Sequence, residues 1–338
     1  MICVYRGKYI VHSLVALVIM VVGLTALPTA SAVAKSSADQ VTYNKAYKSS
    51  RTLYQTKFGF YHNLYKSGMK RSASAKYMYE HHFKITRVAK NGHGVFFKTN
   101  YGWINRDAFY KWLRNNGKLS YSMKVNKQHI LLYSKPWGLK GAKVTGSTST
   151  KQLVGHWYHV DQRAELNTGI GYYRMKVGNK HYWIRGKYLA FNTNKLKGNV
   201  KKVEKAIKTG SGLVGKSKYD WGGGRTSASI ANRRFDCSSF IHWIYAKSGV
   251  RLGPASSCTT YSLIHMGRKI NASNMKRGDI FFFNDKDEGK NCHVAIYLGD
   301  KLFLHDSPSS DTGGVGISSL NDPHWKTRFN HNVRRIVG

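Results

Sequence analysis

Two stretches of this chain repeat one layout of short apolar strands with glycine-containing turns between them. The first copy has candidate strands at 84–88, 94–98 and 101–104, and the second has them at 157–160, 171–175 and 181–184. A Tyr-containing strand precedes each copy, at 60–61 and 132–133, and a short apolar tail follows each, at 107–109 and 187–189. Such strands, rich in aromatic and β-branched residues, are typical of small all-β units. The repeat therefore predicts two related modules.

Each copy carries a tryptophan in its third strand, Trp103 or Trp183. We expect both side chains to lie in the cores of small barrels, where a large apolar ring stabilises a small fold most. A ligand-binding platform is the alternative role.

Positive charge is concentrated in the same part of the chain. The sequence has 55 Lys and Arg against 16 Asp and Glu, a net charge of +39. Residues 33–200 hold 31 of these basic residues and 5 of the acidic ones. A barrel core needs no such excess, so we expect a polyanionic partner: nucleic acid, anionic lipid or an anionic wall polymer.

The amino-terminal residues favour the last of these partners. Arg6 and Lys8 precede an apolar run, 14–27, and small residues at 30–34 follow it. This pattern is typical of a signal peptide over residues 1–32, cleaved near 32 or 34. The run is shorter than the roughly 20 apolar residues that span a bilayer, although a start at Tyr9 would leave an uncleaved anchor open. We therefore expect a secreted, wall-associated protein with no nucleic-acid partner and no stable membrane insertion.

The final part of the chain changes character. We expect residues 113–124 to link the two modules and residues 192–199 to form a second link. Beyond it, apolar residues recur three to four apart, which indicates an amphipathic helix: Val200, Val203, Ala206 and Ile207. A separate domain is predicted from 199 to 338.

Within this domain, a cysteine stands at a predicted helix start. Asp236 can cap a helix whose apolar residues share one side, namely Phe240, Ile241, Ile244 and Tyr245. Cys237 then falls in the first turn, where unpaired amides and the helix dipole favour a thiolate. A lone cysteine is usually a small buried apolar residue, but the neighbours of Cys237 are polar. Cys292, beside His293, is the alternative reactive thiol.

Two histidines follow on a predicted hairpin around residues 299–301. If these residues form a three-residue loop, Leu298 faces Leu302 and Ala295 faces His305. Because side chains alternate along a strand, His293 and His305 then share one polar face. A two-residue loop would separate them, and surface positions without a role are the alternative for either histidine. In this register the core-facing residues are Val294, Ile296, Leu298, Leu302 and Leu304.

The remaining cysteines indicate neither a metal site nor a disulfide. Removal of the leader would leave Cys237, Cys258 and Cys292, an odd number. We expect Cys258 and Cys292 to be buried free thiols, although a pairing between them stays open. No CxxC or HxxxH spacing indicates a metal, so neither a metal nor an organic cofactor is expected.

Several motifs together resemble the NlpC-type, papain-like cysteine peptidases of bacterial cell walls. They are Tyr-Asp-Trp-Gly-Gly at 219–223, Asp-Cys-Ser-Ser-Phe at 236–240, Arg-Gly-Asp-Ile-Phe-Phe at 277–282 and His-Val-Ala-Ile-Tyr-Leu-Gly at 293–299. The repeated region resembles bacterial SH3-like modules of the GW kind. The resemblance implies a multidomain protein, with an α+β papain-like catalytic domain at 199–338 behind two small all-β SH3-like barrels at 45–112 and 120–192.

The resemblance also assigns roles to residues. It implies that Cys237 is the nucleophile, His293 the base and His305 the group that orients the base, with Asp306 as an alternative third group. The pocket for the amino end of the substrate would be lined by Tyr219, Trp221, Asp236 and Ser238. Asp236 could pair there with a free amine. Ser239 departs from the family, in which glycine is usual.

The activity implied is that of a secreted peptidoglycan hydrolase held on anionic wall polymers. By resemblance it would cleave stem peptides between D-γ-glutamate and the diamino acid, through an acyl-enzyme. Two alternatives remain open at this point: a wall-binding or adhesive protein with an inactive peptidase fold, and an amidase or acyl transferase that uses the same nucleophile.

Overall fold

The computed structural model describes residues 37–338, so the expected signal peptide, 1–32, lies outside the described residues. The described chain forms two compact units, 37–111 and 112–338. None of the helices in residues 37–338 is long and apolar enough to cross a membrane.

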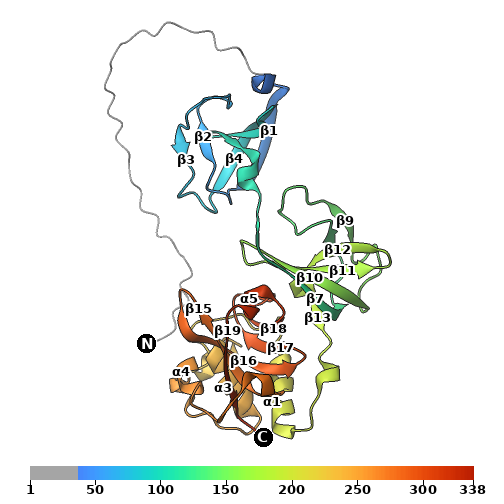
Figure 1. Cartoon of the computed structure of the whole chain (residues 1–338), viewed down its shortest axis with the longest axis vertical. Coiled ribbons are helices and arrows are strands. Elements are labelled where there is room, and N and C mark those ends of the chain that lie inside the picture. The colour runs from blue at the N-terminus through green and yellow to red at the C-terminus, as the bar shows by residue number, and fades with distance from the viewer. Residues whose placement is uncertain (1–36) are drawn as a thin grey trace, which may run out of the picture. The chain divides into compact units, whose positions relative to one another are not determined.

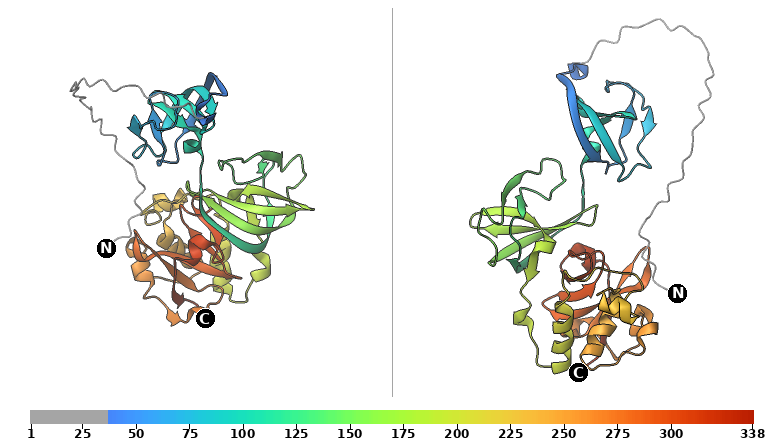
Figure 2. Two further views of the ribbon diagram at one scale, coloured as in Figure 1. Left: turned by 45° about the horizontal axis from the view of Figure 1, so that its top comes forward. Right: turned by 180° about the vertical axis from the view of Figure 1, so that it is seen from behind.

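The first unit is the first of the two predicted modules. Its strands curl around a main apolar core in a single antiparallel sheet, ordered β1-β4-β5-β6-β2-β3 (Figure 2). The strands are β1 (Tyr43–Thr52), β2 (Gly59–Tyr61), β3 (Ala73–Ser74), β4 (His82–Asn91), β5 (Gly94–Thr99) and β6 (Gly102–Asn105). Trp103, expected in the core, is buried instead in a small separate cluster with Ala89 and Phe96, and its neighbour Ile104 fills the main core.

The second module repeats this layout within the second unit. Its strands are β7 (Leu113–Val125), β8 (Leu131–Tyr133), β9 (Val144–Ser147), β10 (Trp157–Leu166), β11 (Gly171–Val177), β12 (Lys180–Arg185) and β13 (Leu189–Phe191). They form one sheet in the order β13-β7-β10-β11-β12-β8-β9. Trp183, expected in the core, is only partly buried, and its neighbours Tyr182 and Ile184 fill the core instead.

The link expected at residues 113–124 is wrong, because these residues form strand β7 between β13 and β10. In its second half, alternate residues are buried, which is the period of a strand with one face on a core. The Asn-Asn-Gly segment at 115–117 hides this period in the sequence.

The last part of the chain is an α+β domain. Its antiparallel sheet, ordered β14-β19-β15-β16-β17-β18, contains β14 (Arg268–Ile270), β15 (Ile280–Asp285), β16 (Gly289–Gly299), β17 (Leu302–Asp306), β18 (Val315–Ser319) and β19 (Phe329–Arg335). The helices are α1 (Lys201–Ser211), α2 (Ser227–Ala231), α3 (Cys237–Lys247), α4 (Thr260–Leu263) and α5 (Pro323–Lys326). Figure 1 shows α1 and α3 side by side against this sheet.

This sheet is buried on both faces. On the helix side lies the predicted set Val294, Ile296, Leu298, Leu302 and Leu304, which packs with Phe240, Ile241 and Ile244 of α3. On the other side, Phe281, Phe283, Phe303 and Trp325 form a separate aromatic core. The side chains of His293 and His305 lie on this aromatic side, against Phe283 and Phe303. The prediction that they share a polar face is therefore wrong about the polarity of that face.

The hairpin between β16 and β17 reaches the expected register by another route. Asp300 and Lys301 form a two-residue turn, with φ of 50° and 58°, and Gly299 pairs with Leu302. The pairing then shifts between Tyr297 and Gly299, so that Ile296 lies opposite Leu304. This irregularity offsets the shorter turn, and the two histidines share a face despite it.

Candidate active site

Cys237 is the first residue of α3, and its capping follows the sequence closely. Asp236 is the N-cap, and its Oδ1 accepts the backbone N–H of Ser239 at 2.9 Å. The Ser239 hydroxyl in turn lies 3.0 Å from the backbone N–H of Asp236. This reciprocal pair is a capping box. It gives Ser239, where glycine was expected, a structural role.

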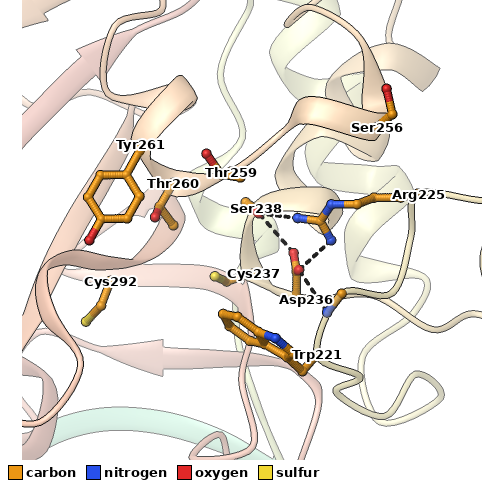
Figure 3. A pocket seen from close by; sticks show the side chains of 11 residues that line it. Trp221, Arg225, Asp236, Cys237, Ser238, Ser256, Thr259, Thr260, Tyr261 and Cys292 are labelled. Atoms are coloured by element: carbon orange, nitrogen blue, oxygen red, sulfur yellow. Dashed lines mark hydrogen bonds and ion pairs between the residues drawn. The ribbon is translucent and has the colours of Figure 1, made fainter. Parts of the chain in front are cut away.

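A pocket of about 300 Å³ opens beside the thiol. Figure 3 shows Cys237 near its centre, with Trp221 and Asp236 on one side and Thr260 and Cys292 on the other. Trp221, Asp236 and Ser238 are among the residues that line this pocket. Tyr219, predicted for the same pocket, is not among the residues that line it. Burial raises the pKa of its hydroxyl, and the charges of Cys237 and Asp236 raise it further.

Arg225 fixes the carboxylate of Asp236. Its Nη1 lies 2.5 Å from Oδ2 of Asp236, and its Nη2 donates to the carbonyl oxygen of Cys258 at 2.6 Å and to the Ser238 hydroxyl at 3.2 Å. The backbone N–H of Gly222 also donates to Oδ2. Asp236 therefore already has donors on both oxygens without a substrate amine.

Two imidazoles and a hydroxyl form a hydrogen-bonded chain on the sheet. Nε2 of His293 lies 2.9 Å from Nδ1 of His305, and Nε2 of His305 lies 3.0 Å from Oγ of Ser318. If Nδ1 of His293 is to accept a proton, its Nε2 must carry the hydrogen and donate to His305. His305 then donates its own Nε2–H to Ser318. The two contacts are compatible with the tautomer that a base requires.

The thiol of Cys237 lies close to β16 at Val294, the residue that follows His293. The backbone N–H of Val294, next to His293, is near enough to the Cys237 sulfur to lower the pKa of the thiol. Burial raises the pKa of the Cys237 thiol well above its usual value, the Asp236 carboxylate raises it further, and the Val294 N–H only partly opposes them. The thiolate expected from the helix start is therefore not favoured in the free protein.

The aromatic core keeps the histidines neutral. The Trp325 ring lies 4.7 Å from that of His305 and 5.4 Å from that of His293, centre to centre. Burial lowers the pKa of His293 to about 3, with a smaller contribution from His324. Burial also lowers the pKa of His305 well below its usual value. A neutral thiol beside a neutral imidazole is the resting state that these shifts favour.

Asp306, the alternative third group, lies on the other face of β17. Its pairing with Val315 and its place two residues from Leu304 put it on the helix side of the sheet. Its carboxyl oxygens are buried, with no hydrogen-bond partner in residues 37–338. Burial, and then the charges of Asp236 and Asp220, raises the pKa of Asp306 to about 8. The group hydrogen-bonded to Nε2 of His293 in this structure is His305, not Asp306.

Sequence reasoning missed Arg225, Ser318 and Trp325. Each lies far along the chain from the group that it contacts, so only the fold brings them together. The sequence holds one weak signal, because Arg225 begins a stretch, 225–234, with several basic residues before the cysteine. The cysteines behaved as expected, since Cys258 and Cys292 are buried free thiols. Within the described residues, no group of three or more His, Cys, Asp or Glu could hold a metal ion.

Comparison with known proteins identifies three regions, which correspond to the two β modules and the α+β domain. Residues 215–334 match the NlpC/P60 family. Residues 43–110 and 115–190 each match the GW (Gly-Tryp) dipeptide domain.

Three curated relatives resemble the C-terminal part. The peptidoglycan DL-endopeptidase CwlO of Bacillus licheniformis is 52% identical over 135 residues, which are 40% of this chain and 28% of that protein. Murein DD-endopeptidase MepS/Murein LD-carboxypeptidase of Escherichia coli is 35% identical over 119 residues, 35% of this chain and 58% of that protein. A probable endopeptidase of Haemophilus influenzae is 30% identical over 126 residues, 37% of this chain and 73% of that protein. The chain thus spans less than two thirds of the length of the first two relatives.

Proposed function

Because this chain belongs to the NlpC/P60 family and carries two GW domains, we propose that it is a secreted cysteine peptidase that hydrolyses peptidoglycan. The names of the relatives, peptidoglycan and murein endopeptidases, support this proposal. The observation that carries it is the position of Cys237. It begins α3 in an open pocket, one residue along β16 from the chain formed by His293, His305 and Ser318.

The bond that we propose lies between D-γ-glutamate and the diamino acid of the stem peptide. The relative with 52% identity is named a DL-endopeptidase, which supports this choice. The relative with 35% identity is named for other bonds, those of a DD-endopeptidase and an LD-carboxypeptidase. The higher identity decides the proposal in favour of the first.

In the proposed first step, Sγ of Cys237 attacks the peptide carbonyl carbon. Its proton passes to Nδ1 of His293 as the S–C bond forms, because the pKa shifts disfavour a thiolate formed in advance. The backbone N–H of Cys237, in the first turn of α3, lacks an acceptor within the helix and can bind the oxyanion.

In the second step, His293 gives this proton to the leaving amine and the C–N bond breaks. Water then attacks the thioester while His293 takes one of its protons, and the thiol is restored as the acid leaves. Nε2 of His293 keeps its hydrogen throughout and donates it to His305, which stabilises the transient imidazolium. His305 itself needs no change of protonation.

We assign the binding of the stem peptide to the pocket beside Cys237. Trp221, which is 40% exposed, offers an apolar face, and Ser238 and Thr260 offer hydroxyl groups. The partners of Asp236 favour a positioning role over the capture of a free amine. The basic GW domains would hold the enzyme on anionic wall polymers.

The proposal can be tested on purified cell wall. Cys237→Ala should abolish the release of soluble fragments while the protein still binds the wall. Cys292→Ala, which removes another thiol of the same pocket, is the matched control and should keep most of the activity. Undiminished release by Cys237→Ala would rule out this nucleophile, and a wild-type protein that binds but releases nothing would favour an adhesive role.

A further inference from the structure

The second GW module shares buried ion pairs with the peptidase domain. Arg163 of β10, 4% exposed, reaches two carboxylates of that domain: its Nη1 lies 2.6 Å from Oδ2 of Asp322, and its Nη2 lies 3.0 Å from Oδ1 of Asp311. On the same strand, Glu165 lies 3.4 Å from Nδ1 of His324. Buried charges are costly unless they are well paired, so these pairs define one docked arrangement.

Glycines of the module make this close approach possible. A Cβ atom at Gly117 of β7 would lie 2.5 Å from Cγ of Pro323. At Gly171 and Gly186, a Cβ would meet the carboxylate of Asp311 at 2.1 and 2.4 Å. Any larger residue at these positions would push the two parts of the unit apart. The contact is therefore built into the backbone of the module as well as into its charges.

The residues that form these ion pairs are connected by further contacts to His293 and His305. Asp322 caps α5 by accepting the N–H of His324 at 3.1 Å, and α5 carries Trp325, which packs on both His293 and His305. By a second route, the hydroxyl of Tyr121 in β7 lies 2.8 Å from Oγ of Ser319, the residue after the Ser318 that contacts His305.

We propose that the second GW module is a fixed part of the peptidase, and that Arg163 and Tyr121 are positioning residues for His293 and His305. Arg163 acts through Asp322 and the Trp325 ring, and Tyr121 acts through β18. The first GW domain, which forms a separate compact unit, would serve as the wall anchor. This inference rests on the proposed function, in which the two histidines are catalytic.

The test compares two Arg→Gln variants of the full-length protein on a soluble stem-peptide substrate, which needs no wall anchor. Arg163→Gln should lower kcat by about tenfold or more, with KM within about twofold, because a small misplacement of a base costs rate rather than binding. Arg174→Gln is the matched control. Arg174 pairs with Asp161 inside the same module, at 2.8 Å for each of two hydrogen bonds, and this variant should keep the wild-type kcat.

A second readout does not depend on turnover. The ring N–H protons of His293 and His305, seen by NMR of the protein labelled with ¹⁵N-histidine, should shift in Arg163→Gln and not in Arg174→Gln. If Arg163→Gln does not fold, Tyr121→Phe decides, because it removes one hydroxyl and leaves the ion pairs intact. It should shift the same protons and lower kcat by a smaller factor.

Folded variants with wild-type kcat and unchanged histidine N–H signals would overturn the inference. A wild-type protein that hydrolyses no stem peptide would instead refute the proposed function, and the NMR comparison would still decide whether the module orients the histidines.

Discussion

At the scale of single residues, burial determines the chemistry of the site. The same aromatic packing that fixes the rings of His293 and His305 also withdraws them from water, and burial lowers both pKa values. Such a histidine is neutral when it accepts the thiol proton and holds that proton only transiently. The hydrogen bond to His305 therefore matters most in the transition state, where the ring of His293 becomes positively charged. The cost of this arrangement should appear in the stability of the protein.

The free energy of unfolding should fall as the pH decreases below about 6.5, the usual pKa of histidine. His293 stays neutral in the folded protein down to its pKa of about 3 but takes up a proton when the chain unfolds, so acid favours the unfolded state. At pH 5 this amounts to on the order of 2 kcal/mol for His293.

Urea unfolding at pH 7 and pH 5 measures this loss. His293→Asn should reduce the difference between the two pH values, whereas His156→Asn, at an exposed position, should not. An equal loss in the wild type and in His293→Asn would show that His293 is not the group responsible.

At the scale of elements, the sequence predicted what depends on neighbours along the chain. The alternation of Val294, Ile296 and Leu298 predicted their shared face correctly, and Asp236 predicted the start of α3. The expected three-residue loop is wrong, but the expected register is correct. A strand irregularity, which the residue types do not reveal, compensates for the shorter turn at Asp300. The prediction that His293 and His305 lie on a polar face was wrong. The aromatic residues that cover this face come from β15, β17 and α5, which are separate in the sequence.

Arg225 joins three elements that the sequence could not connect: the 221–225 loop, the start of α3 and the segment before α4. Arg225→Ala should lower the free energy of unfolding by about 2–4 kcal/mol, because it leaves the carboxylate of Asp236 buried without its cation. Most activity should be lost as the pocket loosens.

Arg234→Ala, at an exposed position nearby, is the matched control for this variant and should change stability by less than about 0.5 kcal/mol. Denaturant unfolding of the two variants gives the comparison. Equal stability of Arg225→Ala and Arg234→Ala would contradict the role assigned to the guanidinium of Arg225.

At the scale of the whole molecule, the repeat predicted two β modules and the charge predicted a polyanionic partner. Neither feature predicted that the second module packs against the peptidase domain. Both copies have the same strand layout, yet the second shares one continuous apolar core with the peptidase domain. The residues responsible, such as Gly117 and Arg163, have no local signal, because a glycine or an arginine in a strand is ordinary until its partner is known.

The charge leads to a prediction for the whole chain. Retention of full-length Cys237→Ala on purified wall should fall steeply as salt rises from about 0.05 to 0.5 M, since salt screens attraction to a polyanion. Walls stripped of anionic polymers should retain less protein at low salt. Retention that ignores both ionic strength and polymer removal would point to specific ligand pockets in the GW domains instead.

The proposed reaction is cleavage of the stem peptide by Cys237 through an acyl-enzyme. Mass spectrometry of muropeptides digested by the wild type and by Cys237→Ala tests it most directly. We predict new termini at D-glutamate and at the diamino acid in the wild-type digest, and their absence in the variant. Freed lactyl groups, which mark an amidase, or identical products from both proteins would contradict the account.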